Sequence, residues 1–225
     1  MDTSLPAILG LGFLLGIRHA MDADHVAAVS AIVSQHRSVL RSCMLGTFWG
    51  IGHELALLGA GLALISLKLT ISPGVERALE TTTACVLIIL GVHVLLKLPV
   101  GSVNVHADAG IASHRHYLHT RVARYHRLVV RGWRPLLLGV LHGLAGSAAL
   151  MLLVLGSMPS SATAILYIAV FGVGSIVGML VLSGVIGIPF ALAVGRSTAA
   201  QAVVQSVAGT ASVIVGVILI WRLAA

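Results

Sequence analysis

Six long apolar stretches constrain this chain more than any other feature of its sequence. They occupy residues 5–33, 43–66, 78–97, 135–156, 163–194 and 203–223. A bilayer has a hydrocarbon core of roughly 30 Å, which a helix of roughly 20 residues crosses. Inside the bilayer, backbone polar groups find no water, so such stretches span it as helices. The pattern predicts an all-α, polytopic membrane helical bundle with six spans, in which Pro189 introduces a kink or a break.

Composition agrees with this prediction and excludes other classes of protein. Only 9% of the 225 residues are charged and 58% are hydrophobic, whereas soluble domains average roughly 25% charged residues. A soluble enzyme, a nucleic-acid-binding domain and a disordered chain are therefore excluded. The expected partner is a lipid bilayer, and nucleic acid is not expected. Cys43 and Cys85 form no CxxC motif, and no disulfide framework is expected.

The positive charges predict the orientation of the spans. With six spans, the loops 34–42, 97–134 and 195–200 share one side of the membrane and hold ten Lys and Arg residues, against three on the other side. Lys and Arg gather in cytoplasmic loops. We therefore expect a multi-pass protein of the cell inner (cytoplasmic) membrane with both termini outside the cytoplasm.

The two halves of the chain resemble each other. Three pairs of segments match at offsets of 122 to 125 residues: GIRHAM at 16–21 with GVLHGL at 139–144, FWGIG at 48–52 with VFGVG at 170–174, and LGVHVLLKL at 90–98 with VGVILIWRL at 215–223. Three spans per half is an odd number, so the halves would have opposite orientations, which is a transporter architecture. This divides the chain into a three-helix repeat over 1–98, a cytoplasmic loop over 99–134 and a second three-helix repeat over 135–225.

A polar insert, RHAMDADH, occupies residues 18–25 in the middle of the first apolar stretch. Each Asp or Arg at the bilayer centre costs roughly 2.5–3.5 kcal/mol on insertion scales. Such groups are tolerable where they pair, face a wet cavity or bind an ion. On an ideal helix His19, Asp22 and His25 lie within an arc of about 120° and Asp24 points elsewhere. The alternative is a helix that is unwound or broken here, because a straight helix over the stretch would measure roughly 43 Å.

The donors of the insert suit a transition metal. Imidazole nitrogens and carboxylate oxygens are the set that Ni, Co or Zn prefers. The sequence therefore predicts a metal site that includes His19, Asp22 and His25, with Asp24 as a ligand or as support for a ligating histidine. The alternative is a buried ion-pair network that also includes Arg18.

Two further histidines are candidates for the same site or for its pathway. His53 follows a glycine-rich segment that permits close helix approach, and we expect it to bind the metal or to line the pathway. Its neighbour Glu54 diverges from it on a helix and is expected to carry a proton or to act as a structural partner. His142 matches His19 in the repeat and is expected to line the pathway or support the site. His93, alone in the third stretch, is expected to be an interhelical hydrogen-bond partner.

The loop over 99–134 contains a second group of histidines. It holds His106, Asp108, His114, His116, His119 and His126 among several arginines. Two interpretations stay open, a solvated basic loop beside anionic lipid headgroups and a loop that captures metal weakly.

Two motifs resemble those of a known family. GIRHAMDADHVAAV resembles the RHAxDADH signature of the nickel/cobalt transporter family, and FWGIGHELALL resembles its second motif, a Gly-His after an aromatic- and glycine-rich turn. The chain is most similar to the six-span, urease-accessory or nickel-efflux branch. The resemblance implies that His19, Asp24 and His25 are metal ligands or their immediate support, with Asp22 and His53 completing the site.

The resulting prediction is a secondary transporter that carries Ni²⁺ or Co²⁺ as its substrate and has no prosthetic group. The sequence contains no GxxxxGK[ST] motif, so this chain is not expected to hydrolyse ATP. The alternatives are a membrane-embedded metallohydrolase and a six-span exporter of a non-metal substrate. His142 and Gly143 are not followed by the LGxDTATE-type stretch of the longer uptake permeases, which leaves the direction of transport and the metal open. A homo-oligomer and a monomer both fit the sequence.

Overall fold

The computed structural model describes residues 5–36, 38–67, 72–98, 133–144, 160–194 and 197–224. Within these ranges the chain is all helical: α1 (Leu5–His19), α2 (Ala23–Val33), α3 (Val39–Leu67), α4 (Pro73–Leu96), a helix over 133–144, α7 (Ser161–Val194) and α8 (Thr198–Ala224). α3, α4, α7 and α8 are long and apolar enough to cross a membrane, and the bent pair α1–α2 makes a fifth candidate span. The predicted all-α, multi-pass class agrees with these helices. The predicted span over 135–156 lies partly outside the described residues.

Local sequence explains where several helices begin. Ser72, Ser160 and Ser197 precede α4, α7 and α8, and each hydroxyl oxygen accepts a hydrogen bond from the backbone N–H three residues later. These caps satisfy donors that a helix start leaves unpaired. α7 continues through Pro189 as one helix, so the predicted break does not occur there. A proline removes one backbone donor, and just before Pro189 α7 packs closely against α3, where Gly184 faces Cys43 and Gly187 faces Ser42.

The first apolar stretch is broken in its middle. α1 ends at His19, α2 begins at Ala23, and the two helices are bent by 54° relative to each other. A tight turn joins them, in which the Met21 N–H donates to the Arg18 oxygen at 2.9 Å and the Asp22 N–H donates to the His19 oxygen at 3.0 Å. The broken alternative is therefore the one that the structure adopts, and the face of an ideal helix does not describe this insert.

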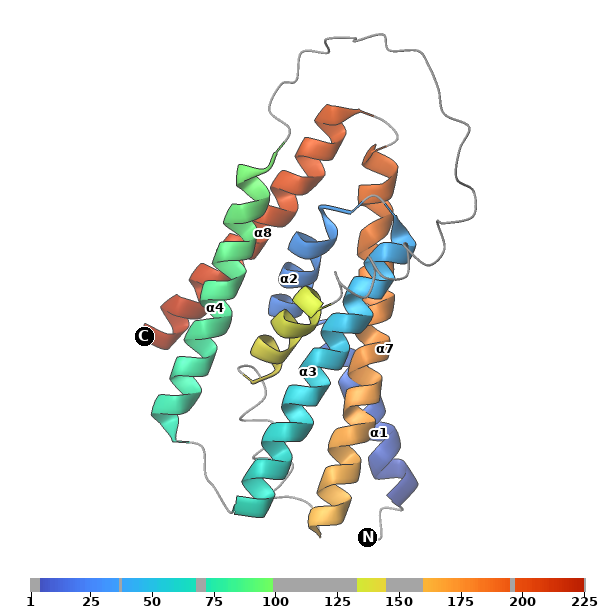
Figure 1. The fold of residues 1–225 in the computed structure, drawn as a ribbon, viewed down its shortest axis with the longest axis vertical. Helices are drawn as coiled ribbons and strands as arrows, with labels where there is room; N and C mark the ends of the chain where they lie inside the picture. The colour runs from blue at the N-terminus through green and yellow to red at the C-terminus, as the bar shows by residue number, and fades with distance from the viewer. Residues whose placement is uncertain are drawn as a thin grey trace.

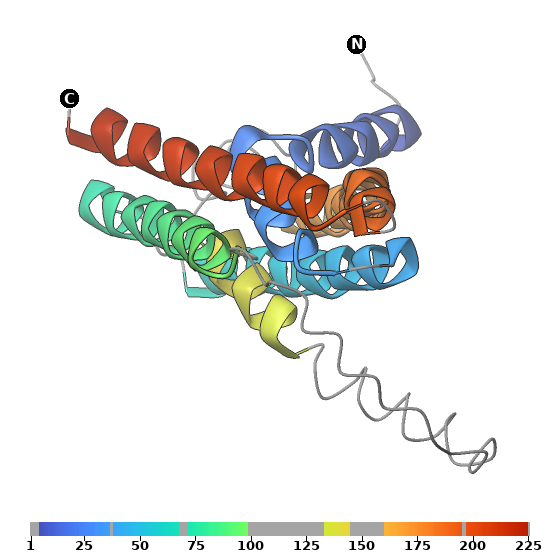
Figure 2. The same ribbon diagram turned by 90° about the horizontal axis from the view of Figure 1, so that it is seen from above.

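The helices form two layers of long helices around α2. α3 and α1 pack along α7, and α4 packs along α8 (Figure 1). α2 contacts α8, α7, α4 and α3, and Figure 2 shows it between the two groups of helices. Small side chains permit this central position, since Ala27, Ala28 and Ala31 of α2 are buried. The metal-site candidates at the start of α2 therefore lie inside the bundle.

Segments predicted to share one side of the membrane lie at one end of the bundle. The turn between α2 and α3, the end of α4 and the start of α8 are at the upper end in Figure 1. α1 enters from the opposite end and reaches the middle, whereas the 133–144 helix lies in the middle of the bundle and runs in the same direction as α3, away from the upper end. Two short helices thus approach the same place from opposite directions.

Glycines bring α1 and α7 into close contact. A Cβ atom at Gly16 of α1 would overlap the backbone oxygen of Phe171, and one at Gly174 of α7 would overlap the backbone oxygen of Phe13. Any side chain at either glycine would separate the two helices. Backbones that approach this closely are typical of membrane helices packed through small residues.

The 133–144 helix contacts α3 through the matching set of residues. A Cβ atom at Gly139 would overlap the backbone oxygen of Trp49, and one at Gly52 would overlap the backbone oxygen of Leu136. These four positions correspond to those of the α1–α7 contact at an offset of 122 or 123 residues. The same pair of glycine contacts is therefore made twice.

The α4–α8 contact is reciprocal within itself. A Cβ atom at Gly91 would approach the backbone oxygen of Gly209, and one at Gly216 would approach the backbone oxygen of Ala84. An offset of 125 residues relates Gly91 to Gly216 and Ala84 to Gly209, so the two contacts are equivalent in the two halves of the chain. Each helix of this pair therefore contributes one glycine that packs against a backbone oxygen of the other helix.

Candidate metal site

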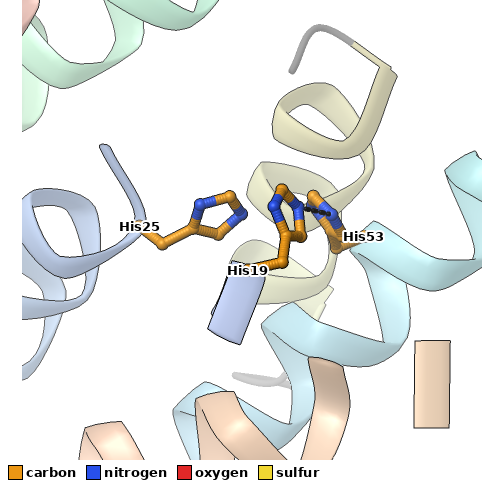
Figure 3. Close-up of side chains that lie close together, drawn as sticks. All are labelled: His19, His25 and His53. Carbon is orange, nitrogen blue, oxygen red and sulfur yellow. Dashed lines mark hydrogen bonds between the residues drawn. The ribbon is translucent and has the colours of Figure 1, made fainter. Parts of the chain in front are cut away.

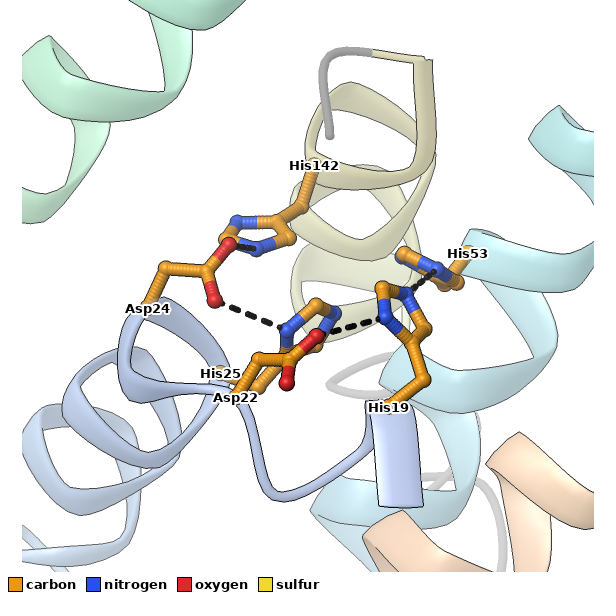
Figure 4. A network of polar contacts seen from close by, with 6 residues as sticks. All are labelled: His19, Asp22, Asp24, His25, His53 and His142. Carbon is orange, nitrogen blue, oxygen red and sulfur yellow. Dashed lines mark hydrogen bonds and ion pairs between the residues drawn. The ribbon is translucent and has the colours of Figure 1, made fainter. Parts of the chain in front are cut away.

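Six ionisable side chains meet where α1 breaks from α2. They come from the end of α1, the start of α2, the middle of α3 and the 133–144 helix (Figure 4). The residues are His19, Asp22, Asp24, His25, His53 and His142. All six were predicted from the sequence, five as members of the metal site and His142 as pathway or support.

Three of the histidines present ring nitrogens to one another. The Nε2 atoms of His19 and His53 are 3.2 Å apart, and His25 points toward the same place (Figure 3). One ring nitrogen from each residue lies within 4.8 Å of the others. Two nitrogens at about 2.1 Å from one metal ion lie about 3.0–3.4 Å apart. The spacing of His19 and His53 is thus already that of two ligands of one ion.

Asp22 orients His19. Asp22 is the N-cap residue of α2, but its carboxylate makes no cap hydrogen bond. Its Oδ2 instead accepts a hydrogen bond from Nδ1 of His19 at 2.8 Å. A carboxylate only accepts, so the proton of a neutral His19 ring is on Nδ1 and the lone pair of Nε2 faces His53. Carboxylate partners of this kind orient ligating histidines in metal sites.

Asp24 holds two histidines at once. Its Oδ1 accepts a hydrogen bond from Nδ1 of His25 at 3.1 Å, and its Oδ2 accepts one from Nε2 of His142 at 3.0 Å. The side chain of His25 is 0% exposed, and its Nε2 has no hydrogen-bond partner among the described residues. An unpartnered, buried ring nitrogen is costly, and a metal ion would satisfy it.

The helix ends add an electrostatic contribution. α1 ends at His19, so its last carbonyl groups give the partial negative charge of a helix C-terminus next to the cluster. In membrane transporters, C-terminal ends of interrupted helices coordinate cations. The positive N-terminus of α2 is on the other side of the break, where Asp22 and Asp24 offset it.

Two aromatic rings cover the cluster, and neither was among the residues predicted from the sequence. The ring of Phe171 lies 5.4 Å from the ring of His19. The ring of Trp49 lies 5.7 Å from that of His25 and 5.3 Å from that of His142. The signal was present in the repeat, since the match of FWGIG with VFGVG pairs Trp49 with Phe171.

The remaining candidates lie apart from the cluster. Arg18 is exposed, and its side chain takes no part in the cluster's hydrogen bonds that involve described residues. The Glu54 carboxylate lies against Gly172 of α7, and neither of its oxygens has a hydrogen-bond partner in the described part of the chain. His93 of α4 is exposed. The loop histidines between 106 and 126 lie outside the described residues.

A membrane bundle in which a broken helix gathers donors between two groups of helices has the architecture of a transporter. Comparison with known families identifies which kind. The model of the NicO family, described as high-affinity nickel-transport protein, matches residues 6–223. The chain belongs to the NicO family. It is therefore a transport protein rather than an enzyme, and Ni²⁺ is a transported substrate rather than a prosthetic group.

Relatives extend this assignment. The chain is 37% identical over 222 residues to the urease accessory protein UreH of Bacillus sp. (strain TB-90), covering 99% of this chain and 94% of the relative. It is 25% identical over 173 residues to the chloroplast protein FOR GROWTH AND FERTILITY 1 of Arabidopsis thaliana, covering 75% of this chain and 46% of the relative. No solved structure matches the chain.

Proposed function

We propose that this protein carries Ni²⁺ across the cytoplasmic membrane and binds it through the Nε2 atoms of His19, His25 and His53. The observation that carries the proposal is the convergence of these three rings at a break in a membrane helix. His25 and His53 are fully buried, and His19 is only 10% exposed. Co²⁺ accepts the same donors and is the second candidate cargo.

The charges near the three rings balance a divalent ion. Asp22 and Asp24 supply two carboxylates, each hydrogen-bonded to one of the ligating rings. Together they match the two positive charges of Ni²⁺, which lowers the cost of holding the ion at membrane depth. The neutral imidazoles then supply the bonds to the metal, and the carboxylates supply the orientation.

We further propose that residues 1–98 and 135–225 are inverted repeats, joined by a cytoplasmic loop over 99–134, with both termini outside the cytoplasm. The matching glycine contacts of α1 with α7 and of the 133–144 helix with α3 support this. The opposite directions of α1 and the 133–144 helix support it as well (Figure 1). Movement of one half against the other would expose the ion alternately to the two sides.

The proposal is tested by nickel transport into liposomes that contain the purified protein. His19→Ala and His25→Ala each remove one donor, and we expect transport to fall by roughly 10–100-fold or more, as for groups that hold metal sites together. The control is His93→Ala, which removes a histidine of α4 outside the cluster and should transport like the original protein.

The proposed site is wrong if both alanine variants transport nickel at the original rate. Parallel measurements with Co²⁺ determine the preferred cargo. Cells that express the protein give the direction of transport, because nickel content rises with uptake and falls with efflux.

A further inference from the structure

We propose that Asp24, His25 and His142 form a second metal station, which shares His25 with the three-histidine station, and that the ion crosses between the two halves by exchanging ligands around His25. This inference rests on the proposed function. It adds a transit step that the first station alone does not contain, and it gives His142 the role of a ligand.

The second station is as compact as the first. One donor atom from each of Asp24, His25 and His142 lies within 4.8 Å of the other two. Asp24 is 3.1 Å from Nδ1 of His25 and 3.0 Å from Nε2 of His142. The His25 and His142 side chains are 0% and 2% exposed, whereas that of Asp24 is 21% exposed. In this station two protons now occupy the spaces between carboxylate and rings, and an ion can replace them.

His25 is placed to serve both stations with one ring. Its Nδ1 faces Asp24, while its Nε2 lacks a hydrogen-bond partner among described residues and one edge of the ring faces His19 and His53 (Figure 3). The His25 ring lies 4.6 Å from the His19 ring and 4.5 Å from the His142 ring, centroid to centroid. It therefore lies midway between the two terminal histidines.

The two terminal histidines come from different halves of the chain. His19 ends α1, which reaches the middle of the bundle from one end along α7, and His142 is on the 133–144 helix, which lies in the middle along α3 (Figure 1). Each packs against an aromatic ring of a long helix, His19 against Phe171 and His142 against Trp49. The equivalence of their surroundings makes them the natural first and last ligands of a path that passes His25.

A short step between two adjacent donor sets keeps the barrier low. An ion that leaves His19, His53 and Nε2 of His25 for Asp24, His142 and Nδ1 of His25 moves from one side of the His25 ring to the other. The protons that it displaces from Nδ1 of His25 and Nε2 of His142 move to the other nitrogen of each ring. A metal ion bound only by a closed, tight set of ligands would leave slowly, and transport requires release as well as binding. Two overlapping stations of three donors each meet both requirements.

The test separates equilibrium binding from transport in His142→Ala. Binding of Ni²⁺ to the purified protein reports the three-histidine station, and flux into liposomes reports the complete path. We expect the dissociation constant to change by less than about threefold and the flux to fall by about tenfold or more. Retained binding also demonstrates that the variant is folded.

Two results would overturn the second station. One is unchanged flux in His142→Ala, and the other is a parallel loss of binding and flux, which would place His142 in a single site with the other histidines. If the original protein neither binds nor transports Ni²⁺, the proposed function itself fails, whatever His142→Ala does.

A pair of conservative variants distinguishes a ligand from a hydrogen-bond partner. His142→Asn keeps an N–H group that can donate to Asp24 but is a poor ligand for Ni²⁺, whereas His142→Cys supplies a thiolate that binds the metal. Flux that is restored by cysteine and not by asparagine supports the station. Flux restored by asparagine alone would overturn it, because His142 would then act only by positioning Asp24.

Discussion

The α4–α8 contact and the contacts around the helix break use the same kind of glycine packing, but they surround different kinds of side chain. Both use glycines that face a backbone oxygen of the partner helix. Between α4 and α8 the buried contents are small or aliphatic, and the Ser212 hydroxyl donates to the Leu87 oxygen at 2.8 Å. Around the break the contents are three buried histidines, His25, His53 and His142, together with the partly exposed His19 and Asp24. Close glycine packing therefore holds the membrane bundle together in both places, and only the contacts around the break enclose the proposed ion site.

The largest effects, on thermal stability and on nickel transport, are expected from substitutions of the packing glycines. Gly139 packs beside the histidine cluster, whereas Gly91 packs in the α4–α8 contact. Gly139→Val and Gly91→Val each place a branched side chain against a backbone oxygen of the neighbouring helix. Overpacking of this kind costs typically about 1–3 kcal/mol, so both variants should unfold at a lower temperature in detergent. Only Gly139→Val should also lose nickel transport. It displaces the 133–144 helix, which carries His142, from Trp49 of α3.

The distinction between the two contacts is wrong if Gly91→Val, rather than Gly139→Val, abolishes nickel transport. A folded Gly91→Val variant that binds nickel and no longer transports it would mean that α4 and α8 take part in the transport movement itself. Thermal unfolding and nickel flux, measured on the same preparations, distinguish the two cases.

The next effect concerns the two carboxylates of the break. Asp24→Asn removes the charge that holds both His25 and His142, whereas Asp22→Asn affects only His19, from a side chain that is 51% exposed. We expect a loss of nickel affinity of roughly 10–100-fold for Asp24→Asn, and a smaller loss for Asp22→Asn. Calorimetric titration with Ni²⁺ measures both. Equal losses would show that the number of carboxylates matters and their hydrogen bonds do not.

The smallest effect is expected from Arg18. It belongs to the polar insert by sequence, but its side chain is exposed and takes no part in the cluster's hydrogen bonds among described residues. Arg18→Gln should leave nickel affinity within about twofold, since exposed charges contribute little to a neighbouring site. A loss as large as that of Asp24→Asn would return Arg18 to the buried ion-pair network that the sequence also allowed.

The helices and the residues of the cluster were predictable because they depend on local pattern. Apolar stretches predicted α3, α4, α7 and α8 to within a few residues, since a membrane helix needs little beyond length and hydrophobicity. The spacing within RHAMDADH selected His19 and His25 for the site. The predicted break at Pro189 does not occur, because a single lost donor does not break a helix that its neighbours support.

The contacts between elements were not predictable in the same way. On an ideal helix Asp24 points away from the other donors. In the folded chain α2 is bent by 54° from α1, and Asp24 contacts both its neighbour His25 and the distant His142. The aromatic cover of Trp49 and Phe171 depends on the register of α3 and α7. That register depends on the pairing of particular glycines with particular backbone oxygens on the neighbouring helix. No single stretch of sequence reveals this pairing.

By itself, the sequence determined that this chain is a membrane protein and predicted that its rare polar residues form the metal site, because ionisable groups are too costly in a bilayer to be there without a partner. Tertiary structure decided which partner each of them has. The break between α1 and α2 turns Asp24 toward a histidine that is 118 residues away in the chain. Distance along the chain is no guide to such a contact, because close packing of helices on glycines creates it only in the folded bundle.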